Sequence, residues 1–168
     1  RATLGIIRIV LERALPLPLD AILEAASAAH QDAFDTAAVR DYMVDRLRFY
    51  YTDRGIAADV VHAAFGATGG VNALLDTDAR VHALDQFRRS DAGKAAAASN
   101  KRVANILSKV EGTPGVSPDR FTDEAERALF AEIEASRQRM DGASDYGERL
   151  SILAGMQPAL DRFFEDVM

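Results

Sequence analysis

The sequence has 168 residues, of which 48% are hydrophobic and 27% are charged, and it contains no cysteine. A chain of this length can bury a core of its own, while the absence of cysteine excludes disulfides, thiolate zinc sites and cysteine nucleophiles. The longest apolar run, residues 4–7, is interrupted by Arg8 and is far shorter than the roughly 20 residues that a membrane-spanning helix requires.

Helix-forming residues dominate the chain, and no segment alternates β-branched with polar residues as a strand does. Helix-breaking residues divide the chain into about eight expected helices, near 3–13, 20–30, 36–54, 57–65, 72–89, 91–111, 122–141 and 144–168. We expect Gly55 as the C′ glycine of the third helix, a capping box from Asp123 and Glu126, and a kink or restart at Pro158. The predicted fold is therefore an all-α bundle of about seven to eight helices.

The formal net charge of −6 is distributed unevenly along the chain. Residues 1–79 carry a net charge of −4 and residues 111–168 carry −7, whereas residues 80–110 hold 7 basic and 2 acidic side chains, a net +5. A local basic surface matters more for binding phosphates than the charge of the whole chain, and the acidic remainder suppresses binding elsewhere.

The expected helix at 91–111 carries this positive charge on one face. Its apolar side is predicted to hold Ala96, Ser99, Val103, Ile106, Leu107 and Val110. The opposite side holds Lys94, Lys101, Asn105 and Lys109, with Arg102 at its edge, and no acidic residue occurs from 93 to 110. An exposed helix face usually mixes charges of both signs, so a face of one sign favours phosphate binding. An ordinary solvated face is the alternative.

The expected helix at 36–54 carries three consecutive aromatic residues, Phe49, Tyr50 and Tyr51, which cannot all enter one core because they point in different directions. Tyr51 is the ring predicted to be left partly exposed, where a base could stack on it, although a role in helix packing is favoured over stacking. Arg46 lies among apolar residues of the predicted buried face and is expected to clamp a buried carboxylate or helix carbonyls. Arg48 points the other way and is expected to be available to a ligand.

The sequence contains no recognisable catalytic or metal-binding constellation. None of His30, His62 and His82 is followed by aspartate, and no pair has the spacing of a zinc site. The glycine-rich loop at 66–70 lacks the Gly-Lys-Ser/Thr ending of a phosphate-binding loop. We therefore predict neither catalytic residues nor metal ligands in this chain.

Four segments resemble the C-terminal region of the bacterial glycyl-tRNA synthetase β subunit: LGIIRI at 4–9, DRLRFY at 45–50, NKRVANIL at 100–107 and PALDRFFEDVM at 158–168. They occur in the order of the family and bracket nearly the whole chain. The resemblance implies that residues 34–168 form a helical anticodon-binding domain, similar to that of arginyl-tRNA synthetase and incomplete at its C-terminus. Residues 1–33 resemble the end of a preceding helical domain related to the HD phosphohydrolase fold.

The resemblance also implies a function. In this family the α subunit holds the site for glycine and ATP, with Mg²⁺ expected, and the β subunit contributes tRNA binding to a cytoplasmic enzyme of two α and two β subunits. For this chain it implies binding of the anticodon region of glycine tRNA, without a cofactor, DNA or a membrane. The residues predicted to contact tRNA are Lys94, Lys101, Arg102, Asn105, Lys109, Arg48 and Tyr51, with Asn100 as a further hydrogen-bonding group. The alternative is a helical scaffold contacting another protein domain, which would expose an apolar patch.

Overall fold

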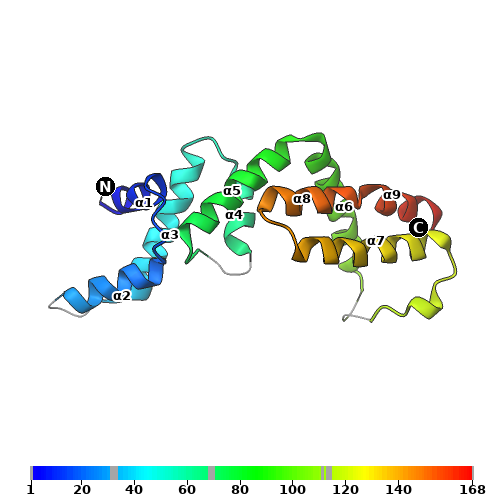
Figure 1. Ribbon diagram of the computed structural model, residues 1–168, viewed down its shortest axis with the longest axis horizontal. Coiled ribbons are helices and arrows are strands. Elements are labelled where there is room, and N and C mark those ends of the chain that lie inside the picture. Colours follow the sequence, from blue (N-terminus) through cyan, green and yellow to red (C-terminus); the bar gives the residue numbers. More distant parts are fainter. Residues whose placement is uncertain (1, 31–33, 68–70, 111, 113–114, 168) are drawn as a thin grey trace. The chain divides into compact units, whose positions relative to one another are not determined.

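The computed structural model describes residues 2–30, 34–67, 71–110, 112 and 115–167. The regular elements of this part of the chain are α1 (Ala2–Glu12), α2 (Leu19–Ala29), α3 (Thr36–Thr52), α4 (Ala58–Gly66), α5 (Leu74–Arg89), α6 (Asp91–Leu107), the 3₁₀ turn η1 (Pro118–Arg120), α7 (Glu124–Asp141), α8 (Tyr146–Gly155) and α9 (Gln157–Asp166). The predicted all-α class is confirmed (Figure 1). No helix among the described residues is long and apolar enough to cross a membrane.

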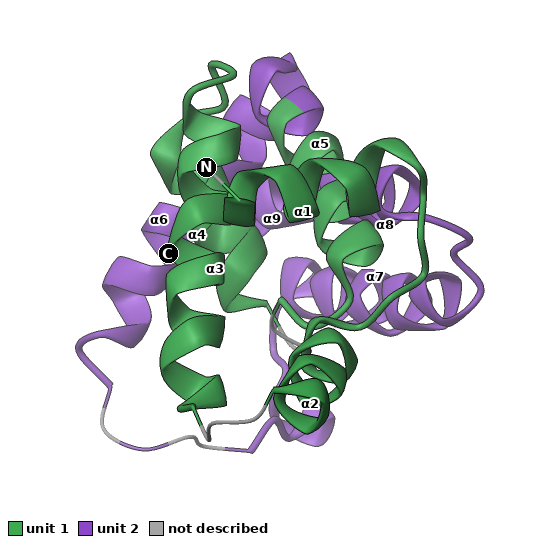
Figure 2. Cartoon of the chain, turned by 90° about the vertical axis from the view of Figure 1, so that its left-hand side faces the viewer, with its two compact units in different colours: residues 1–85 green, residues 86–168 purple. Residues whose placement is uncertain are grey.

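The chain divides into two compact units, residues 1–85 and residues 86–168, and the division falls inside α5 (Figure 2). This boundary differs from the division predicted at residues 33 and 34, because α1 and α2 both pack on α3 within the first unit. The kinship of residues 1–33 with an HD-like domain, and that of residues 34–168 with an anticodon-binding domain, stay predictions.

The core of the first unit forms around α3, which buries Met43, Val44, Leu47 and Tyr51. The other buried members of this core come from α1, α2, α4, α5 and the segments between them: Ile7, Val10, Leu19, Leu23, Ile56, Val60, Val61, Ala64, Phe65, Val71, Leu74 and Val81. Each large aliphatic side chain that is fully buried stabilises the fold by about 1.5–3 kcal/mol.

Local hydrogen bonds end α3 in the way that the sequence predicts. Gly55 has a φ of +83°, a left-handed conformation that glycine adopts without strain. Its N–H donates to the Thr52 carbonyl at 3.0 Å, and the N–H of Ile56 donates to the Tyr51 carbonyl at 3.2 Å. These two bonds form a Schellman motif, so the predicted C′ glycine is confirmed.

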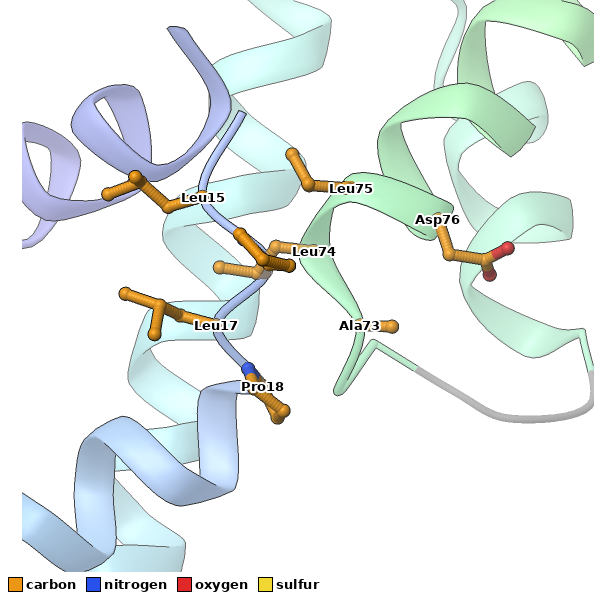
Figure 3. Close-up of a pocket in the computed structure, with 8 residues that line it drawn as sticks. Leu15, Leu17, Pro18, Ala73, Leu74, Leu75 and Asp76 are labelled. Atoms are coloured by element: carbon orange, nitrogen blue, oxygen red, sulfur yellow. The ribbon is translucent and has the colours of Figure 1, made fainter. Parts of the chain in front are cut away.

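An extended segment between α1 and α2 runs beside the start of α5 (Figure 3). The N–H of Leu19 donates to the Asn72 carbonyl at 2.8 Å, and that of Asp20 donates to the Asn72 Oδ1 at 2.9 Å. The two segments line an apolar pocket of about 240 Å³ through residues 15–18 and 73–76. Asn72 therefore fastens the beginning of α2 to that of α5.

In the second unit, α7 packs along α8 and α9, and α6 packs on the same two helices (Figure 1). Asp123 is the N-cap of α7, and the predicted capping box is confirmed because Glu126 accepts the N–H of Asp123 at 2.9 Å. The expected last helix is two helices, α8 and α9, with Pro158 in the first turn of α9. Proline has no N–H to continue α8, so the predicted restart is confirmed.

Candidate nucleic-acid interface

A glycine at a close approach sets the path by which the chain enters α6. Ser90 is the N-cap of α6, and its Oγ accepts the N–H of Gly93 at 3.0 Å. Gly93 is buried, and a Cβ atom built on it would lie 1.9 Å from the carbonyl oxygen of Phe87. The first turn of α6 can approach the preceding backbone this closely only because residue 93 has no side chain.

One side of α6 faces α8 and α9. Ser99 is 9% exposed, and its Oγ accepts a hydrogen bond from Gln157 Nε2 at 2.7 Å. The predicted apolar side is correct around Ser99 and Val103 but wrong at its end, where Leu107 is 61% and Val110 is 45% exposed. The helix ends at Leu107, earlier than expected, because the N–H of Lys109 bonds to the Ile106 carbonyl in a tighter turn, at 3.2 Å.

The three lysines of the chain lie on α6 or just after it: Lys94 and Lys101 on the side opposite Ser99, and Lys109 two residues beyond the helix end at Leu107. Lys94, Lys101 and Lys109 are exposed, as is Asn105 between the last two, and we call these four residues the lysine row. Lys101 and Lys109 form no ion pair within the part of the chain that the structure describes. Lys94 pairs with Asp91 at 3.0 Å, but the two side chains are 66% and 100% exposed. An ion pair this exposed contributes little to stability, and another anion can replace Asp91 as the partner of Lys94.

Arg102 borders the lysine row and is exposed, as predicted, but its guanidinium does not extend freely into solvent. Its Cζ atom lies 3.9 Å from the ring centroid of Phe164, which is 6% exposed in α9. A cation over an aromatic face is attracted by the ring quadrupole, so this contact holds the guanidinium against the Phe164 ring. Arg102 keeps its positive charge beside Lys101 while it also packs α6 on α9.

Three arginines of α7 and α9 pair with acidic residues. Arg137 pairs with Glu134 at 2.9 Å, Arg139 pairs with Glu132, and Arg162 lies 3.5 Å from Glu124 and 3.3 Å from Asp166. The surface of α7 and α9 therefore mixes both signs of charge. The lysine row differs because no acidic residue occurs in the sequence from 93 to 110. Outside the row, Arg120, Arg127 and Arg149 also form no ion pair with the described residues.

The two predicted contact residues of the first unit are both engaged within the protein. Arg48 Nη1 pairs with Asp45 Oδ1 at 2.7 Å, so Arg48 is exposed but already has an acidic partner. Tyr51 is 0% exposed, so the expected partial exposure of its ring is wrong and the favoured role in helix packing is confirmed. The exposed rings of α3 are instead Tyr42 and Phe49, at 48% and 54%.

Tyr51 is the centre of a buried polar contact. Its hydroxyl donates to Asp78 Oδ1 at 2.9 Å, and its ring packs edge-on against Phe65 and His82. His82 Nδ1 lies 3.5 Å from the same carboxylate oxygen, one helical turn after Asp78. The sequence pattern did not reveal this pair, because Asp78 precedes His82 by four residues and does not follow it directly. Among the described residues, no group of three or more possible ligands is placed to hold a metal ion.

The clamp predicted for Arg46 is formed by Arg80. Arg46 is exposed, with its Cζ 4.9 Å from the Tyr42 ring centroid, because the buried face of α3 is rotated toward Val44 and Tyr51. The side chain of Arg80 is 7% exposed. Arg80 pairs with Asp76 and donates from Nη1 to the Ala64 carbonyl of α4 at 2.8 Å. The predicted role exists, but a different arginine performs it.

We expect Tyr51 to make the first unit sensitive to alkali. Burial, and then the nearby Asp78 carboxylate, raise the pKa of the Tyr51 hydroxyl far above its ordinary value of 10.0. Above about pH 10 the unfolded chain releases this proton while the folded chain retains it, so the free energy of unfolding falls as the pH rises. Tyr51→Phe removes this dependence and, at neutral pH, costs about 1–2 kcal/mol through the lost hydrogen bond. Urea unfolding at pH 7 and in alkali checks both effects, and equal alkaline losses in the two proteins would contradict the assignment.

Comparison with known proteins shows which family this chain resembles. A family model described as glycyl-tRNA synthetase beta subunit matches residues 1–66. The chain is 37% identical to the glycine–tRNA ligase beta subunit of Shewanella baltica and 40% identical to that of Aeromonas hydrophila, in alignments that cover 100% of this chain and 25% of each relative. It thus spans about a quarter of the length of the curated relatives that it matches. The resemblance found in the four sequence segments is confirmed, because the chain is similar over its whole length to glycyl-tRNA synthetase β subunits.

Proposed function

We propose that this chain binds the anticodon region of glycine tRNA as part of a glycine–tRNA ligase β subunit, and that the lysine row of α6 holds the RNA backbone. The relatives are named as β subunits of glycine–tRNA ligase, which supports tRNA and an α subunit as partners. The observation that carries the proposal is the exposure of Lys101 and Lys109 without acidic partners among the described residues. In the whole enzyme, the α subunit would supply the site for ATP and Mg²⁺.

The geometry of the row suits a nucleic-acid backbone. Lys94 and Lys101 are two turns apart on one face of α6, a separation of about 10 Å along the axis, so they reach different phosphates. Lys109 extends the row beyond the helix end at Leu107. Lysine contacts to phosphates supply affinity and orientation but carry no sequence information. Recognition of the tRNA therefore needs contacts to unpaired bases in addition to the row.

Reversing one charge of the row tests this proposal. Lys101→Glu in the whole β subunit, assembled with its α subunit, is expected to weaken tRNA binding about tenfold, because a charged phosphate contact is lost and a repulsion is added. Filter binding of glycine tRNA at one fixed salt concentration measures the effect. Arg13→Glu is the matched control, because Arg13 is exposed in the first unit and forms no ion pair with the described residues. Equal affinity of wild type and Lys101→Glu would refute the proposed role of α6.

A scaffold function has one observation in its favour. Leu107 and Val116 in the second unit are 61% and 67% exposed, more than is usual for large aliphatic side chains of a closed core. A contact made by these residues would be apolar, so binding of the α subunit through them would be insensitive to salt, unlike binding through the lysine row.

A further inference from the structure

A pocket lies on the side of α6 that carries Ser99, between α6 and the two helices on which it packs, wholly within the second unit. Its cavity volume is about 290 Å³, and its apolar walls include Phe87, Val103 and Met156. None of the side chains that line it is charged. The pocket is thus chemically distinct from the row, although both share α6.

Two amide side chains give this pocket a hydrogen-bonding rim. Gln157 Nε2 donates to Ser99 Oγ and to Asp161 Oδ1, each at 2.7 Å. Because a carboxylate only accepts hydrogen bonds, Asp161 fixes which end of the Gln157 amide is nitrogen. The Oε1 atom of Gln157 is left as an acceptor without a partner among the described residues, and the exposed Asn100 amide likewise has none. The rim therefore offers both donors and acceptors.

Apolar walls that include the ring of Phe87, with amides at the edge, match one unpaired nucleobase. Bases stack on aromatic and apolar side chains, and the amides of asparagine and glutamine pair with the donors and acceptors of base edges. The absence of charged lining side chains favours the base over its phosphate. A volume of about 290 Å³ lies at the lower end of small-molecule pockets, which fits a single base rather than a larger ligand.

The neighbouring lysine supports a nucleotide as the occupant. Asn100 and Lys101 are consecutive on α6, so their side chains leave the helix about 100° apart. A base paired with Asn100 would place its phosphate toward the long side chain of Lys101. We infer that this pocket binds one unpaired base of the RNA whose backbone lies on the lysine row, which makes Asn100 and Gln157 determinants of base preference. The inference rests on the proposed function of α6.

Single-stranded RNA oligonucleotides of equal length, each containing only one kind of base, test the inference with the assembled α and β subunits. Their phosphates are the same, so differences in affinity report contacts to bases. The wild type is expected to bind one of the four oligonucleotides at least about fivefold more tightly than the weakest, the lower end of what an amide–base pair provides. Asn100→Ala is expected to bring this ratio close to one without changing the salt dependence. Fluorescence anisotropy measures both quantities.

Gln138→Ala is the matched control, because it removes an exposed amide side chain from α7, outside both the pocket lining and the lysine row, and is expected to preserve the ratio. A wild type without base preference, or a ratio unchanged in Asn100→Ala, would overturn the base pocket. Lys101→Glu separates this result from failure of the proposed function. If it weakens all four oligonucleotides alike while Asn100→Ala changes nothing, the lysine row stands and the pocket fails. If Lys101→Glu changes no affinity, the proposed function itself fails.

Discussion

Gly93→Ala is expected to destabilise the second unit by about 3–5 kcal/mol, although alanine favours a helix over glycine by about 1 kcal/mol. The new Cβ would lie 1.9 Å from the Phe87 oxygen and 2.6 Å from its carbonyl carbon, and backbone atoms cannot rotate away as a side chain can. The first turn of α6 would have to move, which would also break the N-cap bond from Gly93 to Ser90. Urea unfolding followed by circular dichroism measures the loss.

Gly155→Ala in α8 is the control, because a Cβ there meets nothing within 4 Å. It is expected to unfold at a urea concentration equal to or above that of the wild type. A wild-type midpoint for Gly93→Ala would mean that α6 does not approach Phe87 as closely as the structure has it. The direction of the lysine row would then also need revision, since this turn sets the start of α6.

Arg80→Ala is expected to destabilise the first unit by about 3 kcal/mol, because it removes a side chain that is only 7% exposed and takes the Arg80 hydrogen bond away from the Ala64 carbonyl. Arg80 connects Asp76 of α5 to the Ala64 carbonyl of α4, and the truncation also leaves a cavity. Arg80→Lys should recover only part of the loss, because an ammonium lacks the fork geometry that serves both acceptors. Urea unfolding again provides the measurement.

The control for Arg80 is the arginine that the sequence pattern suggested instead. Arg46→Ala removes an exposed side chain that contacts the Tyr42 ring, and we expect a loss of about 0.5 kcal/mol or less. Equal losses in Arg46→Ala and Arg80→Ala would contradict the assignment of the clamp to Arg80.

Features governed by local chemistry could be predicted from the sequence. Gly55 ends α3, Pro158 begins a new helix and Asp123 starts α7 because these residues act on their own backbone neighbours. The exposed face of α6 also followed from helical spacing, because its lysines and its buried Ser99 lie on opposite sides. The comparisons confirm the family resemblance of the four segments.

Features governed by packing between distant segments could not be predicted in this way. The sequence pattern placed Arg46 in the buried face of α3 and left Tyr51 partly exposed, but α4 and α5 supply Phe65 and Asp78, which draw Tyr51 inside. Arg46 is exposed for the same reason. Equally, nothing in the sequence around Gly93 indicates that the Phe87 carbonyl lies against it. The pocket beside α6 required the positions of α8 and α9, which are far away in the sequence.

The salt dependence of tRNA binding tests the central role of the lysine row most directly. For the assembled enzyme with Lys101→Glu and Lys109→Glu together, we expect the slope of log affinity against log salt, between about 50 and 200 mM, to be shallower than that of the wild type by about 1.4, since each lost single-strand phosphate contact removes about 0.7. Parallel lines for the two enzymes would show that these lysines touch no phosphate, and the proposed RNA surface would then have to lie elsewhere on the chain.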